Sequence, residues 1–155
     1  MSANGDPRAG SAGSVFFDTN VLLYGFDATN AEKRIRAQAW LEAAWAARRA
    51  RASWQVIHEF YQNATGKLKQ PTDRVRNAVE SYLEWPLEPS GPVLLRRAWH
   101  WCDTAQVHFW DAMIVAAAEQ SGARLLVSED LQDGQSFGSV TVVNPFLHEP
   151  GEFGL

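Results

Sequence analysis

The sequence has little cysteine and no long hydrophobic run, and each absence excludes a class of protein. Its 155 residues contain one cysteine, Cys102, so neither an internal disulfide framework nor a cysteine-ligated zinc site is available. Cys102 is expected to be a small core residue, and a reducing cytosol suits such a chain best. No apolar run approaches the length that crosses a bilayer, and residues 1–13 lack the hydrophobic stretch of a signal peptide. We therefore expect a cytoplasmic protein without a membrane segment.

Basic residues are also in short supply. Lysine and arginine number 14 against 18 aspartates and glutamates, which gives a net charge of -4 and a pI near 5.5. Proteins that coat nucleic acid non-specifically draw their affinity from clustered Lys and Arg, so this class is disfavoured. The basic residues form small groups, typical of solvated helix faces but together compatible with a phosphate backbone. These groups are Arg48, Arg49 and Arg51, Lys67 and Lys69, Arg74 and Arg76, and Arg96 and Arg97.

The composition indicates one globular domain. Hydrophobic residues make up 46% of the chain and charged residues 21%, which is enough apolar surface for one core. No internal repeat or second linker interrupts residues 14–146, so we expect the domain to span them. Residues 1–13 are rich in Gly, Ser and Ala and are expected to form a flexible tail. Residues 147–155 contain Gly and Pro and are expected to fray as a C-terminal tail.

Hydrophobic periodicity predicts strands that alternate with helices. Strand-like runs occur at residues 15–17, 50–54, 125–127 and 140–143, with a brief extended piece at 87. Helical patterns occur at residues 20–24, 30–49, 57–68, 72–85, 92–102 and 110–121. Thr72 is a plausible N-cap for the fourth of these helices. The late strands are apolar enough to be covered on both faces, so we expect an α/β fold: a three-layer sandwich with a mainly parallel sheet flanked by helices.

Two acidic residues follow predicted strands directly. Asp18 comes after the strand at 15–17, and Asp130 follows the strand at 125–127 by way of Ser128 and Glu129. Open α/β folds place ligand sites at the carboxyl ends of their strands, so both carboxylates are expected at one crevice. Each also has a simpler reading, because Asp18 could cap the following helix and Asp130 could be a turn residue.

Two further acidic residues lie on predicted helices. Asp111 is in line with Ile114, Val115 and Ala118, a spacing that turns its carboxylate toward the protein body. A charge that favours the helix N-terminus is the alternative reading for Asp111. Glu59 lies at the border of its helix's apolar stripe and could instead be an ordinary surface glutamate.

Other catalytic patterns are missing. The histidines, at positions 58, 100, 108 and 148, show no paired metal-ligand spacing and are expected to be structural. The sequence has no Gly-rich phosphate loop and no nucleophile-elbow serine. A cluster of carboxylates next to apolar residues is costly to desolvate without a compensating cation. These residues therefore predict an all-oxygen site suited to Mg²⁺ or Mn²⁺.

Four segments together resemble a PIN domain, and specifically the VapC class of toxin ribonucleases. They are FDTNVLLY at residues 17–24, VIHEFY at 56–61, WDAMIVAAA at 110–118 and LVSEDL at 126–131. Their order and spacing are specific, whereas Asp-Thr-Asn alone is weak. The resemblance implies a PIN-like sandwich with an acidic pocket that holds Mg²⁺ or Mn²⁺ and cuts RNA.

The resemblance also implies roles for individual residues and for partners. Asp18 and Asp111 would be the main metal ligands, Glu59 and Asp130 would complete the catalytic pocket, and Asn20 and Ser128 would be polar substrate-binding positions around it. Threonine is common at the position of Ser128 in the family, and serine keeps the hydroxyl group. A VapC-type protein would form a homodimer and bind a cognate antitoxin whose tail blocks the pocket.

Two other functions remain open from the sequence. A housekeeping PIN nuclease in RNA processing would use the same site without an antitoxin, and a non-catalytic binding module would use the acids only as helix caps. Fold alone does not choose among them. The seven tryptophans are expected to serve mostly in the core, with dimer contacts as the alternative.

Overall fold

The computed structural model describes residues 13–155. The tail expected over residues 1–13 therefore lies, apart from Gly13, outside the described residues. Within the described range no helix is both long enough and apolar enough to cross a membrane.

A six-stranded, mostly parallel sheet forms the centre of the fold, with strand order β3-β2-β1-β4-β6-β5. Its strands are β1 (Val15–Phe17), β2 (Ala50–Ser53), β3 (Leu87–Glu88), β4 (Leu125–Val127), β5 (Ser136–Phe137) and β6 (Val140–Val143). All pairs are parallel except β5 with β6, which are antiparallel. The predicted α/β class with a mainly parallel sheet is confirmed.

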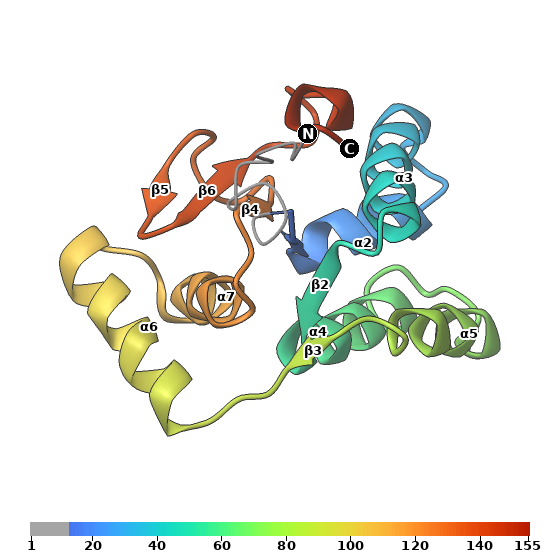
Figure 1. Ribbon diagram of the computed structural model, residues 1–155. Helices are drawn as coiled ribbons and strands as arrows, with labels where there is room; N and C mark the ends of the chain where they lie inside the picture. The colour runs from blue at the N-terminus through green and yellow to red at the C-terminus, as the bar shows by residue number, and fades with distance from the viewer. Residues whose placement is uncertain (1–12) are drawn as a thin grey trace.

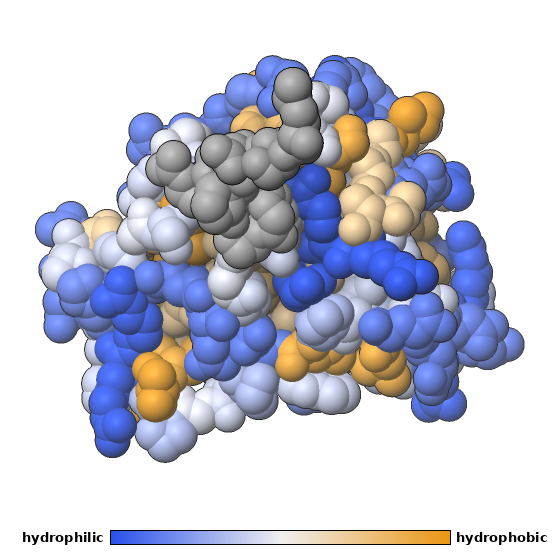
Figure 2. Space-filling model, viewed as in Figure 1, coloured by the Kyte–Doolittle hydropathy of each residue, from blue (hydrophilic) through white to orange (hydrophobic). Residues whose placement is uncertain are grey.

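Helices cover both faces of this sheet, as Figure 1 shows, with α6 and α7 on one side and α2 and α3 on the other. The helices are α2 (Thr19–Phe26), α3 (Ala31–Ala46), α4 (Trp54–Thr65), α5 (Thr72–Tyr82), α6 (Pro92–Ala105) and α7 (Phe109–Gln120). The central strand β1 is fully buried, because both faces of a parallel strand are covered by helices. Helix α7 is also buried along most of its length, which explains its nearly continuous apolar run. Outside this core, the face in Figure 2 is mainly hydrophilic, with small separate hydrophobic patches.

Several predicted helix boundaries differ from the structure; the helix predicted at 57–68 is Trp54–Thr65, and the one predicted at 72–85 ends at Tyr82. Helix α3 ends at Ala46 rather than at Arg49, because Arg48 takes a left-handed conformation with φ of 58° and turns the chain into β2. Thr72 lies inside α5 and is not its N-cap. Pro71 takes that place and makes no side-chain capping bond.

The C-terminal residues pack on α3 instead of fraying. Pro150–Phe153 form a short 3-10 helix, η1, and Pro150 is buried. The ring of Phe153 lies 5.7 Å from that of Trp40, whose indole N–H donates to the carbonyl of His148 at 3.0 Å. The expectation of fraying is wrong because Gly and Pro here form a capped turn over an aromatic core residue.

Candidate functional site

Two adjacent parallel strands bring the first polar groups of the site together. Phe17 of β1 pairs with Val127 of β4, so the residues that follow them, Asp18 and Ser128, meet at the carboxyl edge of the sheet. The hydroxyl of Ser128 donates to Oδ2 of Asp18 at 2.7 Å. Asp18 is only 5% exposed and Ser128 is fully buried. Asp18 also caps α2, since its Oδ1 accepts from the Thr19 amide at 2.7 Å. The capping reading is therefore correct and is compatible with a role in the site.

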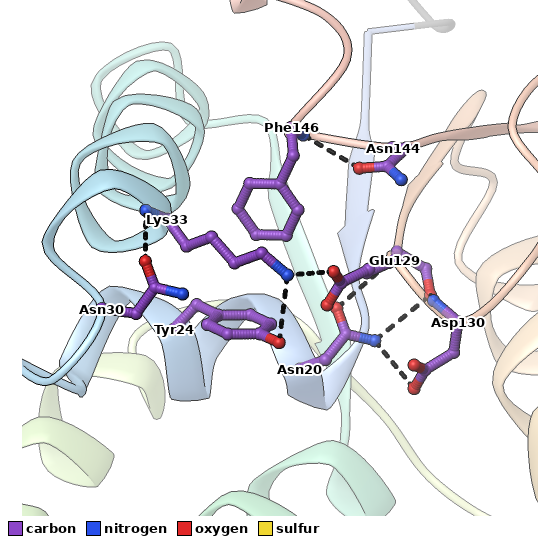
Figure 3. Close-up of polar contacts among 9 residues, drawn as sticks. Asn20, Tyr24, Asn30, Lys33, Glu129, Asp130, Asn144 and Phe146 are labelled. Carbon is purple, nitrogen blue, oxygen red and sulfur yellow. Dashed lines mark hydrogen bonds and ion pairs between the residues drawn. The ribbon is translucent and has the colours of Figure 1, made fainter.

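Asn20 connects Asp18 to the loop after β4. Its amide nitrogen donates to Oδ2 of Asp18 at 3.2 Å and to Oδ2 of Asp130 at 3.1 Å. Its amide oxygen accepts from the backbone N–H of Glu129 at 3.2 Å. Figure 3 shows Asn20 pointing from α2 toward Glu129 and Asp130. One side chain thus holds two carboxylates at a common edge, as their positions after β1 and β4 predicted.

Glu59 joins the site from α4. Its Oε2 accepts from the hydroxyl of Thr19 at 2.8 Å, and its Oε1 accepts from the amide of Gln55 at 2.7 Å. Gln55 lies one helical turn before Glu59, where side chains of a helix meet. Glu59 is therefore not a solvated surface glutamate, because both of its oxygens are engaged at the site.

Asp111 approaches from the first turn of α7. It is half-buried, and its pKa is raised by burial and by the negative charges of Asp130 and Glu59, an effect opposed by His108. Asp111 in turn contributes to the raised pKa of Asp18. The acids predicted from the sequence thus lie within electrostatic range of one another, although four separate elements supply them.

Burial dominates the electrostatics of Asp18. The pKa of this carboxyl is raised from the usual 3.8 to about 7, chiefly by burial; the hydrogen bonds from Ser128 and Thr19 lower it, and the charges of Asp130 and Asp111 contribute to raising it. A buried carboxylate that holds its negative charge needs a compensating cation or proton. Asp18 is therefore the residue whose chemistry most clearly fits a cation.

A closed cage of four carboxylates is not what the structure shows. Within residues 13–155, no three side chains among His, Cys, Asp and Glu are gathered so that they could hold one metal ion. Glu59 is turned to Thr19 and Gln55, and Asp130 is turned to Asn20. An open site still fits Mg²⁺, which commonly keeps several waters and uses one or two carboxylates together with substrate phosphates. The residues present fit that arrangement better than a full set of protein ligands.

A lysine supports the Glu129–Asp130 loop from behind. Lys33 of α3 forms an ion pair with Glu129 and reaches the hydroxyl of Tyr24 at 3.3 Å. Its ammonium lies 4.6 Å from the Tyr24 ring centre and 4.8 Å from that of Phe146. Figure 3 shows the lysine extended between these two rings toward Glu129. The hydrogen bond with Glu129 raises the pKa of Lys33, so the lysine stays charged at neutral pH.

A cavity of about 400 Å³ opens next to the acids. It is lined by Thr19, Asn20, Leu23, Tyr24, Asp27, Glu59, Asn63, Lys67, Leu68 and Asp130. Lys67 is exposed there, so the cavity combines carboxylates with one ammonium group. Lys67 can pair with a phosphate, whereas the carboxylates repel one unless a cation offsets their charge.

Sequence reasoning did not assign roles to Thr19, Gln55 and Lys33. Thr19 had a local signal, since it lies between Asp18 and Asn20 and its hydroxyl can reach across to another element. Gln55 lies four residues before Glu59, a helical spacing that predicts contact between their side chains. Lys33 had none, because its partner Glu129 is far away in the sequence.

Ser128 differs from its predicted role. It was expected at the substrate, but its full burial and its bond to Asp18 place it beneath the carboxylates. It also accepts from the backbone N–H of Asp130 at 3.1 Å. We therefore regard Ser128 as a residue that positions Asp18 and Asp130.

Comparison with known proteins gives a family match and several similar folds. The family model described as PIN domain matches residues 15–132. A toxin-antitoxin complex from Klebsiella pneumoniae is 22% identical, with a TM-score of 0.63, covering 85% of this chain and 98% of that chain. VapC20 of Mycobacterium tuberculosis, described as a sarcin-ricin loop cleaving toxin, is 20% identical, with a TM-score of 0.58, covering 83% and 99%.

DNA-bound VapBC from Salmonella typhimurium is 16% identical, with a TM-score of 0.59, covering 83% of this chain and 96% of that chain. At these identities the likeness shows a common fold. A search among curated proteins found no match.

Proposed function

The chain belongs to the PIN domain family, and from this premise we propose that it is a metal-dependent endoribonuclease, the toxin of a VapBC-type toxin-antitoxin module. It would hydrolyse RNA phosphodiester bonds in the cytoplasm. The observation that carries the proposal is the buried Asp18 carboxylate, which lies at the sheet edge within electrostatic range of Asp111 and Asp130.

A divalent cation fits this site through Asp18 and Asp111, with Asp130 and Glu59 near by. When bound, Mg²⁺ or Mn²⁺ lowers the pKa of a coordinated water and neutralises charge that builds on the phosphate oxygens. Asn20 and Ser128 hold Asp18 and Asp130 in place through the hydrogen bonds described above. Asp130, which is exposed, would accept a proton from the attacking water.

The substrate would be held mainly through its phosphate. Lys67 extends into the same cavity as Glu59 and Asp130, where its ammonium can pair with the phosphate next to the scissile one. The carboxylates alone would repel RNA. Lys67 and the cation are therefore each expected to strengthen binding, and Asp18→Asn, which removes one carboxylate charge, is expected to bind RNA through Lys67 without the cation.

The toxin assignment rests on the likeness to toxin structures and on the charge of the site. Two of the similar structures are described as a toxin-antitoxin complex and as VapBC. An antitoxin could inhibit this chain by placing an arginine among Asp18, Glu59, Asp111 and Asp130. A guanidinium engages carboxylates bidentately and stays charged, so it can replace the cation. We also propose a homodimer.

The test is cleavage of a single-stranded RNA by the purified chain with Mn²⁺ and with EDTA. Asp18→Asn and Asp111→Asn are each expected to lower the cleavage rate by at least about a hundredfold, because each removes a cation-binding charge at little change in shape. Asp73→Asn, a change at an exposed position of α5, serves as the matched control and should cleave like wild type. Near wild-type cleavage by either site variant would disprove the assignment of the metal site.

The antitoxin is tested by growth. Expression of the chain alone should stop bacterial growth, and co-expression with the gene directly upstream should restore it and give a complex on gel filtration. Equal growth in both cases, with RNA cleavage retained in vitro, would favour the housekeeping nuclease instead.

A further inference from the structure

Three of the seven tryptophans are exposed at the surface. Trp54 is 42% exposed, Trp99 51% and Trp110 64%. Large aromatic residues left at the surface mark interaction sites when they gather in one place. Trp54 and Trp110 do so, because they come from different helices and line one cavity, which Trp99 does not line.

This cavity, the tryptophan pocket, has a volume of about 520 Å³. It is lined by Trp54, Gln55, His58, Glu59, Ser90, Trp110 and Met113. Trp54 begins α4 and Trp110 lies in the first turn of α7. The ring of His58 lies 6.0 Å from that of Trp54, tilted by 37°. The pocket is therefore lined by the rings of Trp54, His58 and Trp110 together with the buried Met113.

The tryptophan pocket adjoins the acidic site. Glu59 lines both this pocket and the cavity that contains Asp130 and Lys67. The amide of Gln55 donates to Oε1 of Glu59 at 2.7 Å and to the carbonyl of Trp110 at 3.4 Å. Trp110 also precedes Asp111 directly in the chain. A group in the pocket would thus lie next to a phosphate at the carboxylates.

The charge of the pocket excludes a phosphate as its occupant. None of the described residues that line it is Lys or Arg, and Glu59 is negative. An uncharged planar group that can stack on tryptophan is the better fit. Nucleobases have this chemistry. An aromatic side chain can stack on any base, because every base has a π-face.

We propose that the tryptophan pocket binds an unstacked nucleobase of single-stranded RNA, stacked on Trp54 or Trp110, while Lys67 pairs with the adjoining backbone phosphate. This inference rests on the proposed function and deepens it, because it names the residues that would hold one base of the RNA. Bases inside a duplex are already stacked and cannot enter the pocket.

The first experiment measures binding of a short single-stranded RNA at equilibrium, in the Asp18→Asn background so that the RNA stays intact. Trp54→Ala and Trp110→Ala are each expected to weaken affinity by about five- to a hundredfold, the range measured when stacking residues are replaced by alanine. Trp110→Phe should keep most of the affinity, whereas Trp110→Leu should lose it, because leucine has no π-face. Trp99→Ala is the matched control and should bind like its parent. Unchanged melting temperatures verify folding.

The second experiment uses RNAs that lack one base at a time. One base should matter: its removal should weaken binding to the parent, and should have no further effect in Trp110→Ala. If removal of the base and Trp110→Ala weakened RNA binding additively at every position, the proposal would be overturned. It would also be overturned by tryptophan variants that bind RNA normally but elute at a changed gel-filtration volume. That result would assign the pocket to a second copy of the chain. RNA binding with this pattern but no cleavage by the wild type would uphold the pocket and reject the nuclease. No RNA binding by the parent would reject both.

Discussion

At the residue scale, Asp18 links the site to the stability of the whole fold. Its pKa is raised from 3.8 to about 7, chiefly by burial, so the folded protein keeps a proton that the unfolded chain has already released. The contribution of Asp18 to folding is therefore complete below about pH 4 and is lost as the pH rises to 7. A shift of this size corresponds to roughly 4 kcal/mol of unfolding free energy.

We predict that Asp18→Asn removes this loss. In EDTA at pH 8 the variant should be more stable than wild type, by at most about 4 kcal/mol. Any hydrogen bonds that the amide makes less well than the carboxylate reduce this gain. At pH 4 the difference should nearly vanish. Urea denaturation at both pH values measures it, with Asp73→Asn as an exposed control. Equal stabilities of wild type and Asp18→Asn at pH 8 would show that burial of the Asp18 charge does not destabilise the fold.

Lys67 is the residue where backbone binding is best tested. We predict that Lys67→Ala weakens RNA binding by a similar factor for all sequences and lowers the slope of log K against log salt by about 1, as the loss of one phosphate contact does. Arg96→Ala, at an exposed position of α6, is the matched control and should leave the slope unchanged. A sequence-dependent loss in Lys67→Ala would instead indicate contact with a base.

At the scale of elements, α3 supports the loop after β4 through Lys33. Lys33 is held by Tyr24 and Phe146 and reaches Glu129, the neighbour of Asp130 (Figure 3). A part-exposed ion pair of this kind contributes only about 0–1 kcal/mol to stability. Its main effect is therefore on the geometry of Asp130 rather than on the fold.

We predict that Lys33→Met weakens Mn²⁺ binding by about tenfold, the lower end of the effect of removing a supporting partner. Lys33→Arg should restore most of the affinity, because it keeps the charge next to Glu129. Arg36→Met, on the same helix and also in an ion pair, is the control. Isothermal titration of each variant with Mn²⁺ measures the effect, and wild-type affinity in Lys33→Met would mean that the loop holds its position without the lysine.

At the scale of the whole molecule, the cation should couple the separate elements of the site. Asp18 follows β1, Glu59 lies on α4, Asp111 on α7 and Asp130 in the loop after β4, and their charges repel in the metal-free protein. A ligand that binds only the folded state adds about 2.7 kcal/mol when present at a hundredfold excess over its Kd.

We predict that saturating Mn²⁺ or Mg²⁺ raises the melting temperature by roughly 5–10 °C. Asp18→Asn should show a much smaller rise. Scanning fluorimetry with metal and with EDTA tests this. The same rise in wild type and in Asp18→Asn would place the stabilising ion elsewhere.

Much of this architecture was predictable from the sequence because its signals are local. The apolar run at Val15–Phe17 and the periodic helices identify their elements through neighbouring residues alone. An acid after a buried strand implies a position at the sheet edge, which applies to Asp18. Helical spacing turned Asp111 inward for the same kind of local reason.

Contacts between distant residues depend on the tertiary structure. The sequence by itself determined the parallel α/β class, the strand ends and the acidic residues, since periodicity and composition are properties of short segments. Only the tertiary structure decided that Ser128 lies beneath Asp18, that Thr19 holds Glu59, and that the chain end packs on Trp40. It also decided that Trp54 and Trp110 share a pocket. Each of these depends on how separate elements pack, and the free energy of that packing is spread over the whole core rather than encoded in any one segment.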